Sequence, residues 1–304
     1  MTILITGGTG FVGRRVVRDL LEQGQAFRLL TRRPLEDTRF DVHSVPDLED
    51  EAALCAAVSG AEAVCHLAGR AHILGAPPAD HERQFDVVNV QWTARLARLA
   101  FRSGVRRFVF VSSIGAVATD SQPSQPLTEN TPCRPTTPYG RSKLKAEQVL
   151  ADIAREHSAE LVVVRPPLVY GAGAPGNMAR MARWVRRGVP LPLGGIRNQR
   201  SLVHVDNLSA LLIQCLTHPN APGHVFHVRD PHDYSTPEIL RAVGNNVGRA
   251  ARLFPVPSVL LRGAAMAAGQ RAAYDQLAGW LQVDDSHVRK TLGFAPKALP
   301  FEVV

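Results

Sequence analysis

A tyrosine and a lysine four residues apart are the first residues of this chain that could carry out chemistry together. Tyr139 and Lys143 lie in the segment PYGRSK, residues 138–143. Residues at positions i and i+4 share one face of a helix, so the two side chains are expected to lie side by side. Tyrosine, with an ordinary pKa of ~10, is a poor base at neutral pH, but a neighbouring ammonium stabilises the phenolate and lowers that pKa. We therefore predict that Tyr139 passes a proton to or from a hydroxyl or carbonyl oxygen, with Lys143 as its partner.

A glycine-rich segment near the start of the chain, ILITGGTGFVG over residues 3–13, has the form of a strand, a turn and the beginning of a helix. Gly7, Gly10 and Gly13 leave the backbone without Cβ atoms where a pyrophosphate approaches the helix N-terminus and where the helix packs on the strand. The pattern predicts a dinucleotide-binding loop. Lys143 could then also hold the nicotinamide ribose.

The end of the second predicted strand bears on which dinucleotide is bound. In NAD-binding folds an acidic residue about 20 residues after the loop contacts the ribose 2′-hydroxyl. Here the strand ends in Thr31, Arg32 and Arg33, with no carboxylate. Because an arginine suits the additional 2′-phosphate of NADP, we predict that Arg32 contacts it and that NADP is the preferred cofactor. NAD stays the alternative, in which these arginines are simply solvated.

Two serines at the end of another predicted strand complete the candidate site. Ser112 and Ser113 follow the apolar run that begins at Arg107. The carboxyl ends of the strands in an open α/β sheet face the ligand crevice. We assign the Ser113 hydroxyl as the hydrogen-bond partner of the reacting oxygen. Ser112 is either a cofactor contact or a turn residue that ends the strand.

Short apolar runs alternate with amphipathic helical patterns in the first half of the chain. The predicted strands are residues 2–6, 26–31, 42–45, 63–67, 107–112 and 161–165. The predicted helices are, approximately, residues 10–23, 49–59, 85–103 and 142–156. Near-continuous apolar strands are typical of parallel sheets buried on both faces, and repeated β-α units join them by right-handed crossovers. The predicted fold class is therefore α/β, a Rossmann doubly wound parallel sheet.

Glycine and proline become frequent after residue 166, and the regular alternation stops. We predict an NAD(P)-binding Rossmann domain at residues 1–170, with a returning segment at about 202–229. Residues 171–201 and 230–304 are predicted to form a smaller, discontinuous substrate-binding cap.

Composition limits the partners of the chain. Its 304 residues are 45% hydrophobic and carry a net charge of +8, which would suit an anionic substrate, a nucleic acid or a membrane surface. The arginines are dispersed and no run of five or more basic residues occurs, so we expect no nucleic-acid partner. The first predicted strand begins at Thr2, without room for a signal peptide, and no apolar stretch of about 18 residues occurs. We expect a cytoplasmic protein with no membrane partner.

Two further patterns are expected to be structural. The cysteines, Cys55, Cys65, Cys133 and Cys215, are isolated, and no histidine has ligand spacing, so we predict no metal site. The segment 259–268, rich in Leu and Ala, could lie on a membrane surface, but it is short and weakly basic. We predict a packed helix of the cap.

Further motifs accompany the loop and the Tyr-x-x-x-Lys pair, namely DL at 47–48, HLAG at 66–69, VNV at 88–90, RPPLVYG at 165–171 and RSLVHVDN at 200–207. With them the chain resembles, over nearly its whole length, the extended short-chain dehydrogenase/reductases, also called the NAD-dependent epimerase/dehydratase family. Beyond the loop glycines and Arg32, the resemblance implies cofactor contacts at Phe11, Val12, Asp47, Leu48, Leu67, Ala68, Gly69, Asn89, Pro166 and Val169.

The same resemblance concerns the substrate. Arg200 stands where the family's RxxIHVxD arginine grips the diphosphate of a sugar nucleotide, and Asn177, after the VYG turn, resembles a substrate-phosphate contact. With Ser113 and Tyr139 at the reacting oxygen, these residues imply a UDP-sugar substrate.

One departure from the family narrows the chemistry. Similar 4,6-dehydratases carry Asp-Glu directly after the strand-end hydroxyl residue, whereas this chain has Ile114 and Gly115. Neither residue can carry a proton, so we do not expect dehydration. The segments HLAGRAHIL, RPPLVYGAGAPGN and LPLGGIRNQRSLVHVDN resemble bacterial reductases that act on UDP-2-acetamido-2,6-dideoxy-hexos-4-ulose in making surface polysaccharide. The expectation is NAD(P)H-dependent reduction at C4 of such a sugar.

Three alternatives stay open. A UDP-hexose 4-epimerase would use the same residues but keep its cofactor bound. A non-catalytic Rossmann protein that senses the cofactor ratio is disfavoured by the complete set of Ser113, Tyr139 and Lys143. A steroid- or flavonoid-type reductase is disfavoured by Arg200. The helices predicted at 85–103 and 142–156 resemble those that form a four-helix dimer interface in this family, so a homodimer is expected.

Overall fold

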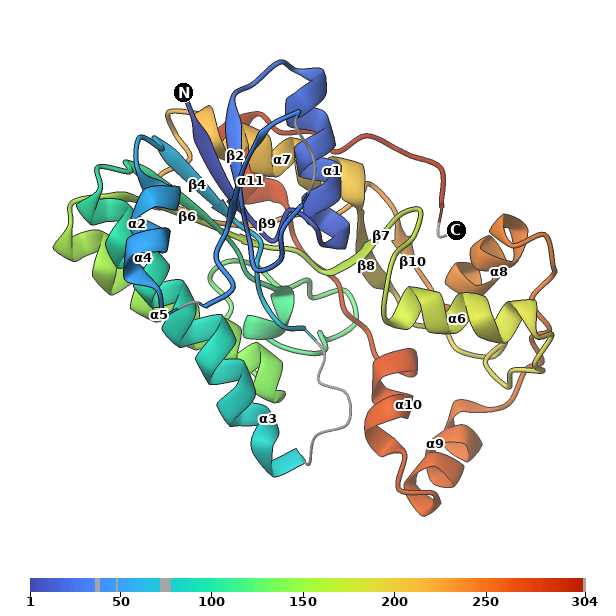
Figure 1. Ribbon diagram of the computed structural model, residues 1–304. Coiled ribbons are helices and arrows are strands. Elements are labelled where there is room, and N and C mark those ends of the chain that lie inside the picture. Colours follow the sequence, from blue (N-terminus) through green and yellow to red (C-terminus); the bar gives the residue numbers. More distant parts are fainter. Residues whose placement is uncertain (36–38, 48, 72–77, 303–304) are drawn as a thin grey trace.

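The computed structural model describes residues 1–35, 39–47, 49–71 and 78–302, and its centre is a seven-stranded parallel sheet (Figure 1). The order across the sheet is β3-β2-β1-β4-β5-β6-β9. Its strands are β1 (Ile3–Thr6), β2 (Phe27–Thr31), β3 (Asp41–Ser44), β4 (Ala63–His66), β5 (Arg107–Val111), β6 (Glu160–Arg165) and β9 (Val225–His227). The direction of sheet growth reverses between β1 and β4, the position where open α/β sheets bind ligands at the carboxyl ends of their strands. The predicted Rossmann fold class is confirmed.

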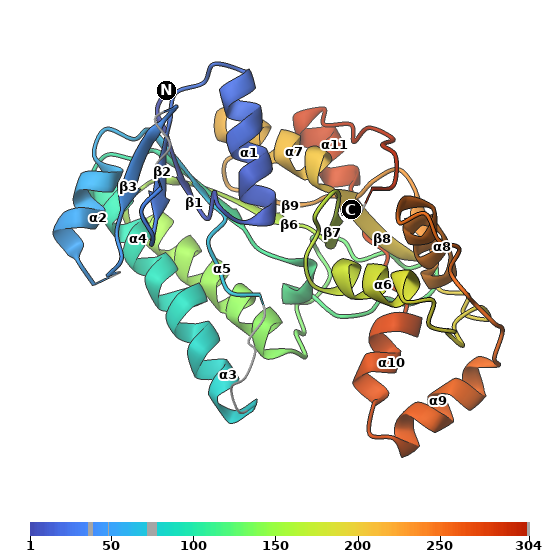
Figure 2. The same cartoon turned by 45° about the vertical axis from the view of Figure 1, so that its right-hand side comes forward.

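Helices cover both faces of this sheet (Figures 1 and 2). One face packs against α1 (Phe11–Glu22), α7 (Val205–Thr217) and α11 (Ser286–Leu292). The other packs against α2 (Glu51–Val58), α4 (Trp92–Arg102) and α5 (Pro138–Glu156). Because both faces are covered, consecutive strand residues such as Phe108, Val109 and Phe110 are all 0% exposed. This explains why the strands are apolar at nearly every position.

A second, smaller sheet lies outside the main one, in the order β10-β8-β7. Its strands are β7 (Leu168–Tyr170), β8 (Arg200–His204) and β10 (Asp233–Tyr234). Together with α6 (Asn177–Arg186) and α8 (Thr236–Asn246) they enclose a separate apolar cluster that includes Tyr170, Met178 and Leu240. The division of the chain into a Rossmann domain and a substrate cap stays a prediction.

The C-terminal segment departs from the predicted cap boundaries of 230–304. Val288 and Leu292 of α11, together with Phe294, are buried in the cluster that contains β1 and α7. The backbone N–H of Lys297 donates to Oδ1 of Asn207 at 3.0 Å. The chain therefore returns to the main sheet, through long-range contacts that no local pattern reveals.

Two predicted helices begin elsewhere. The segment predicted as one helix over 85–103 starts at the last residue of α3 (Pro78–Phe85). It continues through a π-helical turn, Asp86–Gln91, into α4. Helix α5 begins at Pro138 and not at residue 142, because Thr137 caps it: Thr137 Oγ1 accepts from the Gly140 N–H at 3.0 Å, and proline suits the first helical position. Both Tyr139 and Lys143 thus lie within the helix.

A hairpin of two short helices, α9 (Ser258–Ala267) and α10 (Arg271–Ala278), projects from the body at the lower right of Figure 2. None of the residues of either helix, all of which the structure describes, is buried. The prediction of a packed helix at 259–268 is therefore wrong. Across the described residues, no helix has both the length and the apolar character needed to span a bilayer.

Candidate active site

The glycine-rich loop connects β1 to α1, and its backbone packs closely against the start of α1 and against the segment that follows β4. Gly7 has φ +72°, and a Cβ there would lie 2.6 Å from the backbone nitrogen of Ala68. A Cβ on Gly13 would lie 2.1 Å from the carbonyl oxygen of Gly7. Helix α1 begins after Gly10, and no side chain caps its first turn. The free N–H groups of that turn and the bare backbone fit a dinucleotide pyrophosphate.

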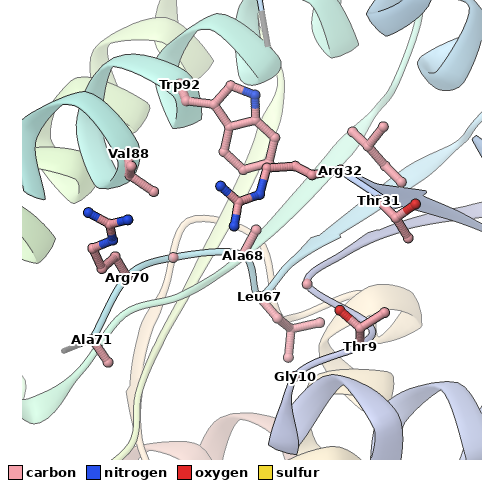
Figure 3. A pocket seen from close by; sticks show the side chains of 13 residues that line it. Thr9, Gly10, Thr31, Arg32, Leu67, Ala68, Arg70, Ala71, Val88 and Trp92 are labelled. Atoms are coloured by element: carbon pink, nitrogen blue, oxygen red, sulfur yellow. The ribbon is translucent and has the colours of Figure 1, made fainter. Parts of the chain in front are cut away.

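A cavity of about 480 Å³ lies beside this loop (Figure 3). Its lining includes the predicted cofactor residues Gly7, Gly10, Arg32, Leu67, Ala68 and Gly69. In Figure 3 the Arg32 side chain extends across the cavity toward Ala68 and the ring of Trp92. The carboxyl ends of β1, β2 and β4 thus meet at one site, as expected at the reversal point of the sheet.

Other predicted cofactor residues lie away from the cavity lining. Phe11 packs against the apolar cluster of the smaller sheet and Val12 against that of the main sheet, while Gly13 is buried beneath the loop. The exposed carboxylate of Asp47 accepts from the backbone N–H of Glu49 at 2.9 Å, which makes it a local turn contact. Leu48 lies outside the described residues.

Sequence reasoning did not find several residues that line the cavity. Trp92 and Val88 approach from the π-helical turn and the start of α4, and Arg70 follows the HLAG motif. The indole Nε1 of Trp92 is buried and has no hydrogen-bond partner among the described residues. The available signal was the position of Val88 and Trp92, which flank Asn89 in the predicted helix.

The predicted catalytic residues come together at the carboxyl end of β5 and the start of α5. The ring of Tyr139 packs at 5.9 Å from the ring of Phe85. Val111 is the last residue of β5, and its carbonyl accepts from the Nζ of buried Lys143 at 2.8 Å. Ser113 is half-buried, and its Oγ accepts from the Gly115 N–H at 3.1 Å. One helix face and one strand end therefore place a phenol, an ammonium and a hydroxyl at a single site.

Burial, more than charge, sets the protonation of this pair. Burial raises the pKa of Tyr139 to about 12, although its interaction with Ser113 lowers it. Burial lowers the pKa of Lys143 to about 8, while nearby Glu147 raises it. The direction is therefore opposite to the prediction that Lys143 brings the pKa of Tyr139 below its ordinary value. Tyr139 is a neutral phenol at neutral pH and can donate a proton.

A buried ion pair between Arg165 and Glu147 lies next to Lys143. The Arg165 guanidinium donates to both carboxylate oxygens of Glu147, at 3.0 Å from Nε and 2.6 Å from Nη2. The Ser112 hydroxyl donates to the same carboxylate. Ser112 thus holds β5 and α5 together, which agrees with the structural alternative for this residue. Glu147 and Arg165 were not predicted, although Glu147 follows Lys143 by four residues on the same helix face.

Three more predicted residues support the site through the backbone. Asn89 is buried; its Oδ1 accepts from the Arg70 N–H at 2.8 Å, and its Nδ2 donates to the Arg70 carbonyl at 3.0 Å. It therefore fixes the strand end that lines the cavity. The carbonyl of buried Pro166 accepts from the Ile114 N–H at 2.9 Å, and Val169 is half-buried against the main core.

The turn after Ser113 has no acidic residue and little space. A Cβ on Gly140 would lie 2.2 Å from the Gly115 carbonyl oxygen, so α5 begins in direct backbone contact with this turn. A Cβ on Gly115 would lie 3.3 Å from the Ser113 hydroxyl. The turn is packed for small residues and carries no group that could expel water from a substrate.

Arg200 begins β8 in the smaller sheet, as a half-buried side chain. Its Nη1 donates to the Gly279 carbonyl at 2.7 Å, and within the described part of the chain no carboxylate forms an ion pair with it. Burial lowers the pKa of Arg200 to about 10, which is still far above neutral pH. A desolvated cation without a carboxylate partner is suited to an anionic ligand. Asn177, the other predicted substrate contact, is the first residue of α6 and half-buried.

Comparison with known proteins gives a family match over most of the chain. A sequence profile of the NAD dependent epimerase/dehydratase family matches residues 3–228. A Vibrio cholerae protein named UDP-glucose 4-epimerase is 35% identical over 297 residues, which cover 97% of this chain and 90% of that protein.

Solved structures show the same fold. A short-chain dehydrogenase/reductase superfamily protein of Agrobacterium tumefaciens, with bound NAD, is 25% identical, has a TM-score of 0.75 and aligns over 98% of this chain and 93% of its own. UDP-glucose 4-epimerase of Thermotoga maritima, with UDP-glucose, is 22% identical with a TM-score of 0.77, over 98% and 94% of the two chains. At 22% identity this second likeness concerns the fold alone.

Proposed function

The chain belongs to the NAD-dependent epimerase/dehydratase family and is an enzyme of the extended short-chain dehydrogenase/reductase type, and from this premise we propose that it acts on a UDP-sugar at C4. Its reaction is the NAD(P)H-dependent reduction of a UDP-2-acetamido-2,6-dideoxy-hexos-4-ulose. The observation that carries the substrate class is Arg200, a desolvated guanidinium without a carboxylate partner among the described residues. A planar guanidinium matches the paired oxygens of a diphosphate.

Each residue of the site has its own role in this reaction. When bound, a nicotinamide dinucleotide supplies the hydride for the sugar C4. Ser113 donates a hydrogen bond to O4, and Tyr139 gives its phenolic proton to the same atom. Lys143, on the same helix face, stabilises the phenolate that remains. Glu147 connects α5 to the end of β6 through Arg165, and to the strand end just before Ser113 through the Ser112 hydroxyl.

Reduction is supported by the resemblance of HLAGRAHIL, RPPLVYGAGAPGN and LPLGGIRNQRSLVHVDN to bacterial 4-keto-sugar reductases. Tyr139, a neutral phenol, can give O4 the proton that reduction requires. Dehydration is disfavoured because Ile114 and Gly115 cannot carry a proton.

The second candidate is UDP-hexose 4-epimerase activity. The name of the Vibrio cholerae relative, 35% identical over nearly the whole chain, favours it. An epimerase returns the hydride to the same sugar, so it consumes no cofactor and retains the one it has. A product survey separates the candidates: the protein is incubated with NADPH and either UDP-4-keto-6-deoxy-aminosugars or UDP-hexoses, and the sugars are identified by NMR. We expect reduced product only from the keto sugars; interconverted hexoses with unchanged NADPH would establish the epimerase.

We further propose NADP as the preferred cofactor, on the strength of Arg32 in the cavity lining. Arg32→Ala should raise the KM for NADPH about tenfold or more and leave that for NADH nearly unchanged, because it removes a charge-assisted contact with the 2′-phosphate. Arg33→Ala, at an exposed neighbour that does not line the cavity, is the matched control. Steady-state kinetics with both cofactors gives the answer. An equal rise for NADPH and NADH would instead fit the NAD bound in the Agrobacterium tumefaciens relative.

A further inference from the structure

The α9–α10 hairpin exposes large apolar side chains. Val259 is 79% exposed, Leu260 65% and Met266 53%, and Phe254, just before the hairpin, is 45% exposed. Apolar residues scattered singly over a surface are ordinary, but a group of them on one projecting element indicates an interaction surface. Figure 2 shows the hairpin projecting from the body, and no residue of its two fully described helices is buried.

The exposed apolar residues of α9 share one helix face. Leu261 and Ala265, four residues apart, are the half-buried positions within it, and the helix packs against α10. At 3.6 residues per turn, Val259, Leu260 and Met266 lie together on a different face, which bears no charge. The hairpin is closed by the Tyr274 hydroxyl, which donates to the Ser258 carbonyl at 3.1 Å. This bond joins the two helices of the hairpin, so the outer face of α9 is an ordered apolar strip.

Basic residues predominate around this strip, and Asp275 of α10 is the one acidic residue of the hairpin. Between residues 249 and 274 the sequence contains Arg249, Arg252, Arg262 and Arg271 and no Asp or Glu. All four arginines are exposed, and among the described residues only Arg271 forms an ion pair with a carboxylate, Asp275, at 3.6 Å. The neighbouring segment 171–201 likewise has six arginines and no acidic residue. The surface around the strip is therefore positively charged.

We propose that this docking surface, formed by Phe254, Val259, Leu260 and Met266 with Arg252 and Arg262, binds the surface of an anionic lipid bilayer. An apolar helix face flanked by arginines lies in the bilayer interface, with the apolar side chains among the acyl chains and the guanidiniums at the anionic headgroups. A second copy of the chain is a poorer occupant, because an isologous contact would bring together two surfaces of the same positive charge.

The docking surface is rigidly attached to the body of the protein. The end of α10 is held by Asn198, whose Nδ2 donates to the Leu277 carbonyl at 3.1 Å, and by Arg200, which donates to Gly279. Docking would therefore hold the Arg200 side of the molecule toward the membrane. The proposal differs from our expectation of no membrane partner, which stays a prediction, and it concerns a peripheral contact and not a span.

Flotation of the full-length protein with lipid vesicles tests the proposal. We expect it to float with vesicles of phosphatidylcholine mixed with phosphatidylglycerol, and to float much less with phosphatidylcholine alone. Leu260→Asp should reduce the vesicle-bound fraction at least about tenfold, because a leucine side chain that would lie among the acyl chains is replaced by a charge. Leu35→Asp, which adds the same charge at another exposed leucine outside the hairpin, should float like the wild type.

A second variant tests the electrostatic part. The double variant Arg252→Ala/Arg262→Ala should lower binding to the anionic vesicles about tenfold or more and weaken its dependence on salt. Three results would overturn the proposal: no flotation of the wild type, equal flotation with both vesicle types, or a concentration-dependent dimer that Leu260→Asp dissociates without any vesicle binding. The last would make the surface an interface between copies. Thermal unfolding of each variant shows that it is folded.

Discussion

Tyr139→Phe should lower the turnover number by at least about 10²-fold while leaving the affinity for the cofactor nearly unchanged. The substitution removes the phenolic hydroxyl that exchanges a proton with the sugar O4, and it keeps the ring that packs against Phe85. Burial keeps this phenol protonated, so its loss takes away the proton donor itself. Steady-state kinetics with a keto-sugar substrate, together with fluorescence titration of NADPH, measures both quantities.

The control for this variant is Tyr274→Phe, which removes a phenolic hydroxyl on the α9–α10 hairpin. It should turn over substrate like the wild type. Wild-type turnover by Tyr139→Phe would remove Tyr139 from the mechanism. A parallel loss of cofactor affinity would show that the tyrosine is structural.

Arg200→Ala should weaken UDP binding by about 1.5–3 kcal/mol, roughly a ten- to hundredfold rise in Kd. The guanidinium is desolvated and has a carbonyl contact but no carboxylate partner within the described residues, so a diphosphate would be its counter-ion. Arg200→Lys keeps the charge but loses the planar fork, and it should weaken binding by a smaller, measurable amount. Isothermal titration with UDP alone is sufficient, because the effect does not need the sugar.

The matched control is Arg197→Ala, three residues earlier and exposed, which should bind UDP like the wild type. Thermal unfolding should accompany the titration, since Arg200 also holds the Gly279 carbonyl. If Arg200→Ala and Arg197→Ala weaken UDP binding equally, the effect comes from the overall positive charge and not from a specific contact of Arg200. If the wild type binds no UDP at millimolar concentration, the substrate is a carbonyl compound without a diphosphate.

The elements that local sequence patterns specify were predicted well. The buried strands appear as apolar runs, and the i, i+4 spacing of Tyr139 and Lys143 puts both on one face of α5. The glycine loop also follows from spacing, because the close approaches at Gly7 and Gly13 require residues without a side chain. These features depend on residues near each other in the chain.

The features that failed depend on packing between distant segments. The sign of the pKa shift of Tyr139 is set by how deeply the folded chain buries the phenol, which spacing does not contain. Trp92, which was not predicted, lines the cavity next to a π-helical turn, whereas Asp47 is not in the lining and its contact with the cofactor stays a prediction. The apolar pattern of α9 led us to predict a packed helix in preference to a membrane-surface helix, and only the fold shows that no residue of α9 is buried.

The most direct test of the proposed reaction follows the hydride. The protein is incubated with UDP-2-acetamido-2,6-dideoxy-hexos-4-ulose and NADPH that carries deuterium at the transferred position of the nicotinamide, and the product is examined by NMR. The proposed function predicts one deuterium at the sugar C4 and one NADPH oxidised for each molecule of product. An unlabelled product, or interconversion of UDP-hexoses by a cofactor that stays bound and is not consumed, would contradict it and identify an epimerase.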